Sequence, residues 1–184
     1  VIITAAELKQ IVSLHLEQLD LSQQTPARLW RLPVCYDEEF APDIKDVVSK
    51  TNLTPDEVIA LHTSRILEVA IMGFLPGLGY LTGVDDALHL PRRSEPRTFV
   101  PQGSVGLAMD QTVIYPLNSP GGWNLIGRMP IPLFDQKREN PILFSAGDPV
   151  SFYAVNADKY GELAASCVDG NLPICPEQAD KAAL

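Results

Sequence analysis

The sequence between residues 100 and 127 decides the fold. Residues 101–106 read PQGSVG, residues 111–116 read QTVIYP, and residues 119–127 read SPGGWNLIG. Short β-branched runs alternate here with turns rich in glycine and proline, which is typical of a β-barrel or a β-sandwich. The same stretch can bring backbone amides, an indole, a phenol and an amide side chain into one small volume, so it also predicts a ligand pocket.

The residues ahead of this stretch indicate helices mixed with strands. A capping box of Thr4 with Glu7, followed by apolar residues at helical spacing, predicts a helix over residues 5–20. A strand is expected over residues 29–36, with Pro33 confining it to an edge or a bulge. The sequence therefore predicts an α/β lobe before the β-rich part.

Further elements are expected between this lobe and the β-rich part. Two short helices are predicted over residues 43–50 and 55–63, the second because Thr54 can cap it. Residues 66–72 form a short apolar run, which predicts a buried strand.

Composition and charge exclude several functional classes. The chain has 184 residues, 46% of them hydrophobic, and a net charge of −9, so a general nucleic-acid-binding or membrane surface is not expected. No apolar run reaches the ~20 residues of a membrane span. Cys35, Cys167 and Cys175 are an odd, widely spread set, which favours reduced thiols and a cytoplasmic location over a disulfide framework.

Five motifs in a fixed order carry a resemblance to a known family. They are residues 73–81 (GFLPGLGYL), 91–97 (PRRSEPR), 100–106 (VPQGSVG), 111–116 and 119–127. Over residues 30–155 the chain resembles the family of the 5-oxoprolinase B subunit, also called allophanate hydrolase subunit 1 or the kinase inhibitor KipI, which is a carboxyltransferase C/D-type domain.

The resemblance implies an α+β fold with a cyclophilin-like β-barrel domain. We expect a small ferredoxin-like α/β lobe over residues 1–80, the barrel over residues 81–160 and a loosely ordered tail over residues 161–184. Family members usually carry a further segment ahead of Val1, so the lobe is expected to be incomplete.

Three arginines stand on a proline-stiffened segment. Planar guanidinium groups at Arg92, Arg93 and Arg97 suit a carboxylate or phosphate ligand. The alternative is that they form surface pairs with acidic neighbours such as Asp85 or Glu95. Arg93 and Arg97 are the first candidates for catalysis, and Arg92 is a candidate for substrate binding.

His62 lies near the carboxyl end of the second short helix. It could shuttle a proton near neutral pH, or it could be a packed, hydrogen-bonded structural residue. The three histidines have no metal-ligand spacing, so no metal site is expected.

The loop of residues 73–81 is either a hinge between domains or a lid over a ligand. It lacks the lysine of a P-loop, so it is not expected to bind a nucleotide in that way. The family pattern has an aromatic residue where this chain has Leu78. The candidate residues of the loop are Gly73, Phe74, Pro76, Gly77 and Tyr80.

The wall of the pocket is expected from residues that can contact a small polar ring. An amide side chain can pair with a lactam, and aromatic rings can enclose it. The alternative is that the aromatic residues close the end of a barrel. The candidates are Gly103, Gln111, Tyr115, Pro120, Gly121, Gly122 and Trp123.

Two positions in the β-rich part depart from the family, which commonly has glycine in this segment. The chain carries Met109 and Val113, and a positive φ would be especially awkward for Val113.

The resemblance implies a subunit of an ATP-dependent 5-oxoprolinase, which opens 5-oxoproline to glutamate. ATP is then a co-substrate of the complex, and no cofactor bound to this chain is expected. The implied partners are the homologous C subunit and the A subunit of that enzyme, without which the chain is expected to be inactive. The alternatives are an allophanate hydrolase or urea amidolyase type of subunit, and a non-catalytic inhibitor of a histidine kinase.

Overall fold

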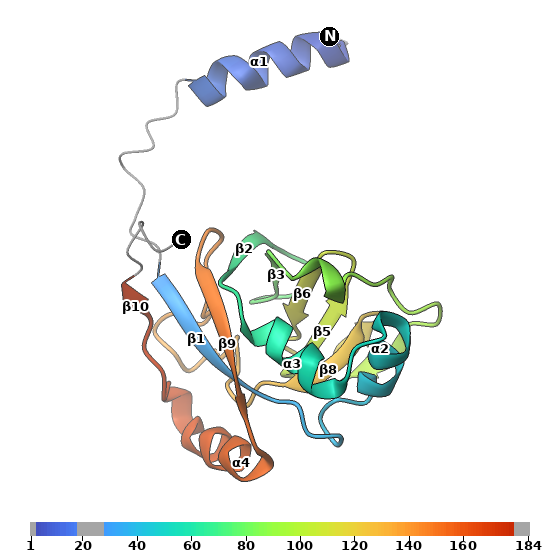
Figure 1. The fold of residues 1–184 in the computed structure, drawn as a ribbon. Helices are drawn as coiled ribbons and strands as arrows, with labels where there is room; N and C mark the ends of the chain where they lie inside the picture. The colour runs from blue at the N-terminus through green and yellow to red at the C-terminus, as the bar shows by residue number, and fades with distance from the viewer. Residues whose placement is uncertain (1–2, 18–27, 179–184) are drawn as a thin grey trace.

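The computed structural model describes residues 3–17 and 28–178 (Figure 1). Its helices are α1 (Ala5–Glu17), α2 (Ile44–Thr51), α3 (Pro55–Thr63) and α4 (Ala157–Ser166), with short 3-10 turns at Asp86–Leu88 and Val168–Gly170. Its strands are β1 (Arg28–Cys35), β2 (Leu67–Met72), β3 (Gly79–Thr82), β4 (Arg97–Val100), β5 (Ser104–Ala108), β6 (Gln111–Ile114), β7 (Ser119–Gly121), β8 (Asn124–Arg128), β9 (Pro149–Val155) and β10 (Glu177–Gln178).

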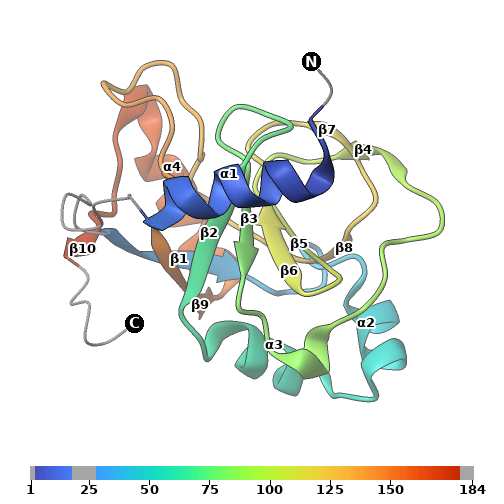
Figure 2. The ribbon, with the colours of Figure 1, turned by 90° about the horizontal axis from the view of Figure 1, so that it is seen from above.

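A closed barrel forms the body of the protein. The sheet runs in the order β10-β1-β8-β5-β6-β3-β2-β9, and a parallel pairing between β1 and β9 closes it. Every other pairing in it is antiparallel. β4 and β7 form a separate two-stranded sheet, seen beside the barrel in Figure 2. The predicted α+β class and β-barrel are confirmed.

The barrel wall separates two clusters of apolar side chains. Alternate residues of a strand point to opposite faces of the sheet. In β6, Ile114 belongs to the large central core, whereas its neighbours Val113 and Tyr115 belong to a smaller cluster. The smaller cluster also holds Trp123 and Leu78. The aromatic residues of the expected pocket therefore lie on the outer wall, and the alternative that they close the end of the barrel is wrong.

The predicted boundary between residues 80 and 81 falls inside β3, so it is corrected. β1, β2 and β3 belong to the barrel, and one core extends from Trp30 to Phe152. The barrel needs these strands because β1 supplies the pairing that closes it. Of the expected ferredoxin-like lobe, the structure describes α1 ahead of β1.

The strand predictions for β1 and β2 each need one correction. Pro33 does not place β1 at an edge, because β9 pairs along it from Trp30 to Cys35. On the other side of β1, β10 and β8 pair only with its two ends, so the missing N–H of Pro33 interrupts neither ladder. β2 is only half-buried, with Leu67 and Val69 facing the core.

The region from residue 161 onward is more ordered than predicted. The expected boundary at residue 160 lies within α4, whose amino end is capped by Asn156 through a hydrogen bond from the Lys159 N–H. The chain then continues to β10, which pairs with β1 at Arg28 and Leu29. Residues 179–184 lie outside the described residues.

The predicted helices are confirmed within one or two residues. Thr54 and Glu57 form the predicted capping box on α3. Thr4 and Glu7 do the same on α1. The last residues of the helix predicted over residues 5–20 lie outside the described residues.

Of the two positions where the family commonly has glycine, Met109 has a strained backbone conformation and Val113 does not. Met109 has a φ of 56°, in the left-handed region that favours glycine. Val113 is an ordinary strand residue paired with Tyr80 and Gly106.

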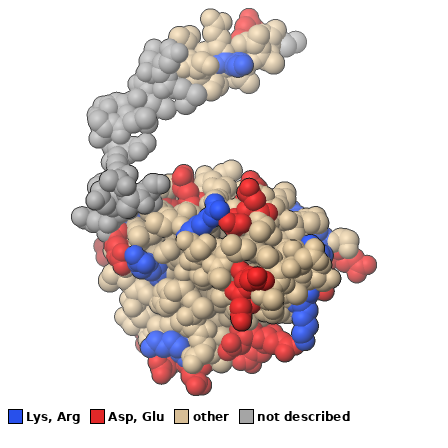
Figure 3. Space-filling view, in the orientation of Figure 1, with Lys and Arg blue, Asp and Glu red and all other residues tan. Residues whose placement is uncertain are grey.

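Charged side chains of both signs are mixed on the surface. On the face shown in Figure 3, basic residues stand singly among acidic ones. Within residues 3–17 and 28–178, no helix is long and apolar enough to cross a membrane.

Candidate functional site

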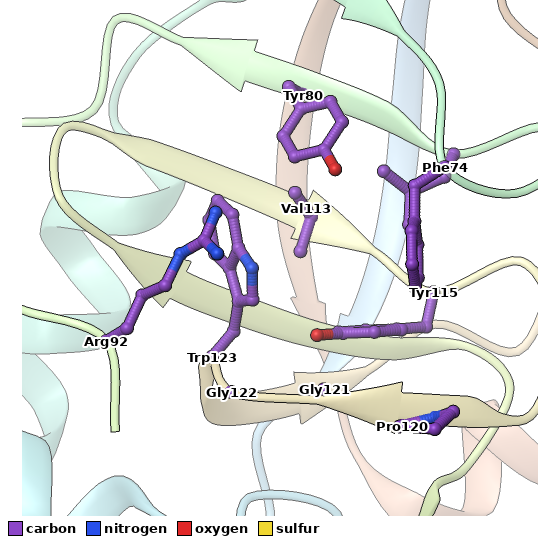
Figure 4. Close-up of a pocket in the computed structure, with 10 residues that line it drawn as sticks. Phe74, Tyr80, Arg92, Val113, Tyr115, Pro120, Gly121, Gly122 and Trp123 are labelled. Carbon is purple, nitrogen blue, oxygen red and sulfur yellow. The ribbon is translucent and has the colours of Figure 1, made fainter. Parts of the chain in front are cut away.

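A pocket lies on the outer wall of the barrel, between the loop after β2 and strand β7 (Figure 4). Its volume is about 130 Å³, smaller than the ~300–1,000 Å³ of sites for drug-sized ligands. One small ring can therefore fill it, and a larger ligand would extend beyond it. It is lined by Phe74, Leu78, Tyr80, Arg92, Val113, Tyr115, Pro120, Gly121, Gly122 and Trp123.

Two glycines let the pocket wall close tightly. A Cβ on Gly121 would overlap the hydroxyl of Tyr115, and a Cβ on Gly106 would come within 2.8 Å of the Cβ of Trp123. The ring of Trp123 can therefore lie close above β5, and the phenol of Tyr115 can lie along β7.

Arg92 is the arginine that faces the pocket. Its guanidinium carbon lies 5.4 Å from the centre of the Trp123 ring, a contact that holds the cation in place while leaving its N–H groups for a ligand. No carboxylate among the described residues forms an ion pair with it. The prediction of a substrate-binding role for Arg92 therefore has a geometric basis.

Tyr115 presents a protonated hydroxyl in the pocket. Burial raises its pKa to about 12, even though Arg92, Arg97 and the backbone of Trp123 act in the opposite direction. At neutral pH the phenol is therefore a hydrogen-bond donor for an oxygen of the ligand.

Arg93 and Arg97, which were predicted to be catalytic, do not line the pocket. Arg97 makes two hydrogen bonds to the carboxylate of Asp43, at 2.8 and 2.6 Å, and Arg93 adds a third at 2.7 Å. Asp43 is only 2% exposed. A buried carboxylate needs such partners, so the two arginines are paired inside the protein, and the acid that pairs with them was not among the predicted neighbours.

His62 is also placed away from the pocket. It is 2% exposed and stacks on Phe152, with ring centres 4.6 Å apart. Its Nε2 lies 3.1 Å from Thr112 Oγ1, which points into the barrel, whereas the next residue, Val113, lines the pocket outside. The wall of β6 thus separates His62, which was predicted to be catalytic, from this pocket.

The hydrogen bonds of His62 define its protonation. The hydroxyl of Thr112 donates to the carbonyl of Gly106, so Thr112 Oγ1 accepts from Nε2–H of His62. Nδ1 then accepts from the hydroxyl of Tyr36 at 2.7 Å. Burial lowers the pKa of His62 to about 3, so this ring is neutral and structural.

The other predicted residues divide between the pocket and its surroundings. Phe74 and Tyr80 line the pocket, whereas Gly73, Pro76 and Gly77 belong to the same loop but do not line the pocket. Gly77 has a φ of 85°. Gly103 lines a different hollow, with Gln102 and Tyr160, and Gln111 is at the start of β6; neither reaches the pocket.

The sequence did not predict two of the residues that line the pocket, nor the buried aspartate that binds Arg93 and Arg97. Leu78 and Val113 line the pocket, although the sequence marks them only as departures from the family. Along each strand, residues that face the core alternate with residues that face outward, and this alternation could have indicated that Leu78 and Val113 face outward. Nothing in the sequence marked Asp43 as a partner of the arginines, because its one notable feature is its position before a predicted helix.

The described residues bring together no group of three histidine, cysteine, aspartate or glutamate side chains that could hold a metal ion. The three cysteines are all free thiols.

Comparisons with known proteins agree with the motifs. The family described as carboxyltransferase domain, subdomain C and D, matches residues 1–144. The 5-oxoprolinase B subunit of Bacillus subtilis is 39% identical over 153 residues, which are 83% of this chain and 64% of that protein. The corresponding B subunit of Haemophilus influenzae is 46% identical over 121 residues, 66% of this chain and 57% of that protein. The chain thus spans less than two thirds of the length of these relatives.

Solved structures share the fold. A conserved uncharacterized protein from Pyrococcus horikoshii superimposes with a TM-score of 0.69 at 37% identity, covering 84% of this chain and 69% of that one. The Kluyveromyces lactis urea carboxylase has a TM-score of 0.74 at 18% identity, covering 94% of this chain and 18% of that one, and shows a likeness of fold alone. The chain therefore belongs to the family of the carboxyltransferase domain, subdomain C and D, as its motifs predicted.

Proposed function

We propose that this chain is part of a subunit of an ATP-dependent 5-oxoprolinase and that the pocket binds 5-oxoproline. Relatives that are 39% and 46% identical are named as B subunits of 5-oxoprolinase. The observation that carries the proposal is Arg92, a cation held against Trp123 at the edge of a small pocket and without a carboxylate partner among the described residues.

The pocket offers complementary contacts for each part of 5-oxoproline. Arg92 pairs with the carboxylate of the substrate, for which a guanidinium is well suited. The hydroxyl of Tyr115 donates to the lactam carbonyl, because burial keeps the phenol protonated. The rings of Tyr80 and Trp123, tilted against each other with their centres 6.0 Å apart, form an apolar wall along one side of the substrate ring.

The reaction converts 5-oxoproline, ATP and two molecules of water into glutamate, ADP and phosphate, because opening the lactam and releasing phosphate from ATP each consume one water. An amide ring opens readily only when its carbonyl is activated, and transfer of a phosphoryl group to the lactam oxygen would supply that activation. Arg92 is the one cation among the ten lining residues, so its pairing with the substrate carboxylate leaves no lining cation for the phosphates of ATP. We therefore propose that the companion chains, the homologous C subunit and the A subunit, complete the site in the cytoplasm and that this chain alone is inactive.

The test is formation of ADP and glutamate from ATP and 5-oxoproline by the full-length protein co-purified with its companion subunits. Omission of this subunit should abolish both products, and Arg92→Ala should raise the KM for 5-oxoproline in an intact complex. A stable wild-type complex that forms neither product from 5-oxoproline would disprove the proposal.

A second candidate is a urea amidolyase type of reaction on allophanate. A urea amidolyase from Lachancea kluyveri is 26% identical over 149 residues, a weaker likeness than that to the 5-oxoprolinase subunits. Supplying allophanate to the same complex distinguishes the two, because only one of the two substrates should be consumed.

A further inference from the structure

Asp43 lies behind the pocket wall and touches three parts of it. Its Oδ1 accepts from Arg93 at 2.7 Å and from Arg97 at 2.6 Å. Its Oδ2 accepts from Arg97 at 2.8 Å and from the backbone N–H of Leu125 at 2.7 Å. One buried carboxylate thus connects the start of α2, the arginine segment and β8.

The backbones of the two arginines in turn hold the two pocket glycines. The N–H of Arg93 donates to the carbonyl of Gly122 at 2.8 Å, and Arg97 is opposite Gly121 in the β4–β7 ladder. The side chains that Asp43 binds therefore belong to the residues that fix Gly121 and Gly122. Leu125, its third partner, is two residues beyond Trp123.

The same set of hydrogen bonds also fixes the backbone on both sides of Arg92. It is adjacent to Arg93 in sequence, and the carbonyl of Pro91 on its other side accepts a hydrogen bond from Asn124 at 2.9 Å. The backbone on each side of Arg92 is thus hydrogen-bonded to the segment from Gly122 to Asn124, and of Pro91, Arg92 and Arg93 only Arg92 lines the pocket.

We propose that Asp43 is a positioning residue: through Arg93, Arg97 and Leu125 it fixes the wall from Gly121 to Trp123 and keeps Arg92 in place for the ligand. A carboxylate is required because four hydrogen bonds reach its two oxygens. An asparagine would turn an N–H₂ group toward at least one of these donors. The kinetic part of the test below rests on the proposed function.

The first measurement is steady-state kinetics of the complete complex carrying Asp43→Asn. Because a displacement of about 1 Å in a positioning group can cost ~100-fold in rate, we expect kcat/KM for 5-oxoproline to fall at least tenfold, mostly through a higher KM. Asp43→Glu, which retains the charge, should recover part of the loss.

Asp148 provides the matched control. It is also a buried carboxylate that binds an arginine, Arg28, and a backbone N–H, that of Ser145. Its further partner is Trp30 of the core, far in sequence from the pocket wall. Asp148→Asn should therefore lower stability as Asp43→Asn does but change KM less than twofold. Equal kinetic effects of the two variants would overturn the proposal, since general destabilisation would then explain both.

A second readout does not depend on activity. The chain has two tryptophans, Trp30 and Trp123, and in protein labelled with 5-fluorotryptophan their ¹⁹F signals are assigned by the variants Trp30→Phe and Trp123→Phe. Asp43→Asn should shift or split the Trp123 signal alone, and Asp148→Asn should affect the Trp30 signal alone. An unchanged Trp123 signal in Asp43→Asn would overturn the proposal.

These readouts separate failure of the positioning role from failure of the proposed function. A wild-type complex that does not act on 5-oxoproline, combined with the reciprocal ¹⁹F pattern, would disprove the function but support the positioning role. If Asp43→Asn does not fold, Arg97→Gln removes two of the four hydrogen bonds to Asp43 and should displace the same Trp123 signal.

Discussion

The phenolic oxygen of Tyr115 lies against the α-carbon of Gly121, in the space that a Cβ at that position would occupy. The two residues come from neighbouring parts of the pocket wall, because Tyr115 directly follows β6 and Gly121 is the last residue of β7. The hydroxyl proposed to contact the lactam carbonyl therefore depends on a residue without a side chain.

Gly121→Ala should displace the Tyr115 hydroxyl and lower kcat/KM for 5-oxoproline by roughly tenfold or more, because a shifted donor no longer meets the carbonyl. Overpacking should also cost about 1–3 kcal/mol of unfolding free energy. Kinetics of the complex and denaturant unfolding check the two effects. The control is Gly161→Ala in α4, where a Cβ meets nothing within 4 Å, and where alanine should stabilise the helix by about 1 kcal/mol. Unchanged kinetics in Gly121→Ala would contradict the role of Tyr115.

Arg92→Ala should raise the KM for 5-oxoproline by about 10–100-fold, since hydrogen bonds to charged groups contribute roughly 1.5–3 kcal/mol. Arg92→Lys should fall between this variant and the wild type, because it retains the charge but loses the planar contact with Trp123. Arg31→Ala, which breaks an exposed pair with Glu177, serves as control and should leave KM unchanged. A KM that does not respond to Arg92→Ala would remove this arginine from the substrate site.

His62 should make stability, and not catalysis, depend on pH. Its pKa is lowered from 6.5 to about 3 in the folded protein, so the unfolded chain binds the proton more readily between these values. Stability should consequently fall as pH falls from 6.5 toward 3, with a contribution of up to ~1.4 kcal/mol per pH unit, whereas well above pH 6.5 His62 should contribute no pH dependence to stability.

His62→Gln should flatten this dependence. It should also lower stability at pH 7.5 by about 1–3 kcal/mol, because the buried hydroxyls of Tyr36 and Thr112 lose well-placed partners. Denaturant unfolding of both proteins at several pH values is the measurement. Turnover by the folded variant should be retained, and a loss of kcat without loss of structure would restore the catalytic interpretation of His62.

Met109→Gly should stabilise the protein by about 1 kcal/mol, because Met109 has a φ of 56° and its side chain is about half-exposed. For a chain of this size the Tm should rise by ~2–4 °C. Val113→Gly is the comparison at the other departing position, and it should destabilise the protein because Val113 is buried in a regular strand. A lower Tm for Met109→Gly would show that its side chain contributes more than its backbone costs.

Local signals in the sequence predicted much of the fold. The capping box at Thr54, the apolar run after it and the glycine-rich turns from residue 73 onward predicted the helices and the barrel. They did so because capping, periodicity and turn formation depend on residues a few positions apart. The boundary at residue 80 could not be predicted in this way, since the pairing of β1 with β9 joins residues more than a hundred positions apart.

The same distinction holds for the site. By itself the sequence determined which residue types the pocket would contain, among them Tyr115, Gly121, Gly122 and Trp123, because motifs with fixed spacing carry that information. Only the tertiary structure decided which cations are available. Asp43, fifty positions away, binds Arg93 and Arg97 and leaves Arg92 for a ligand, and the wall of β6 places His62 on the inner side of the barrel. Whether a side chain is paired, buried or open to a ligand depends on distant segments packed against it, and no local pattern records that packing.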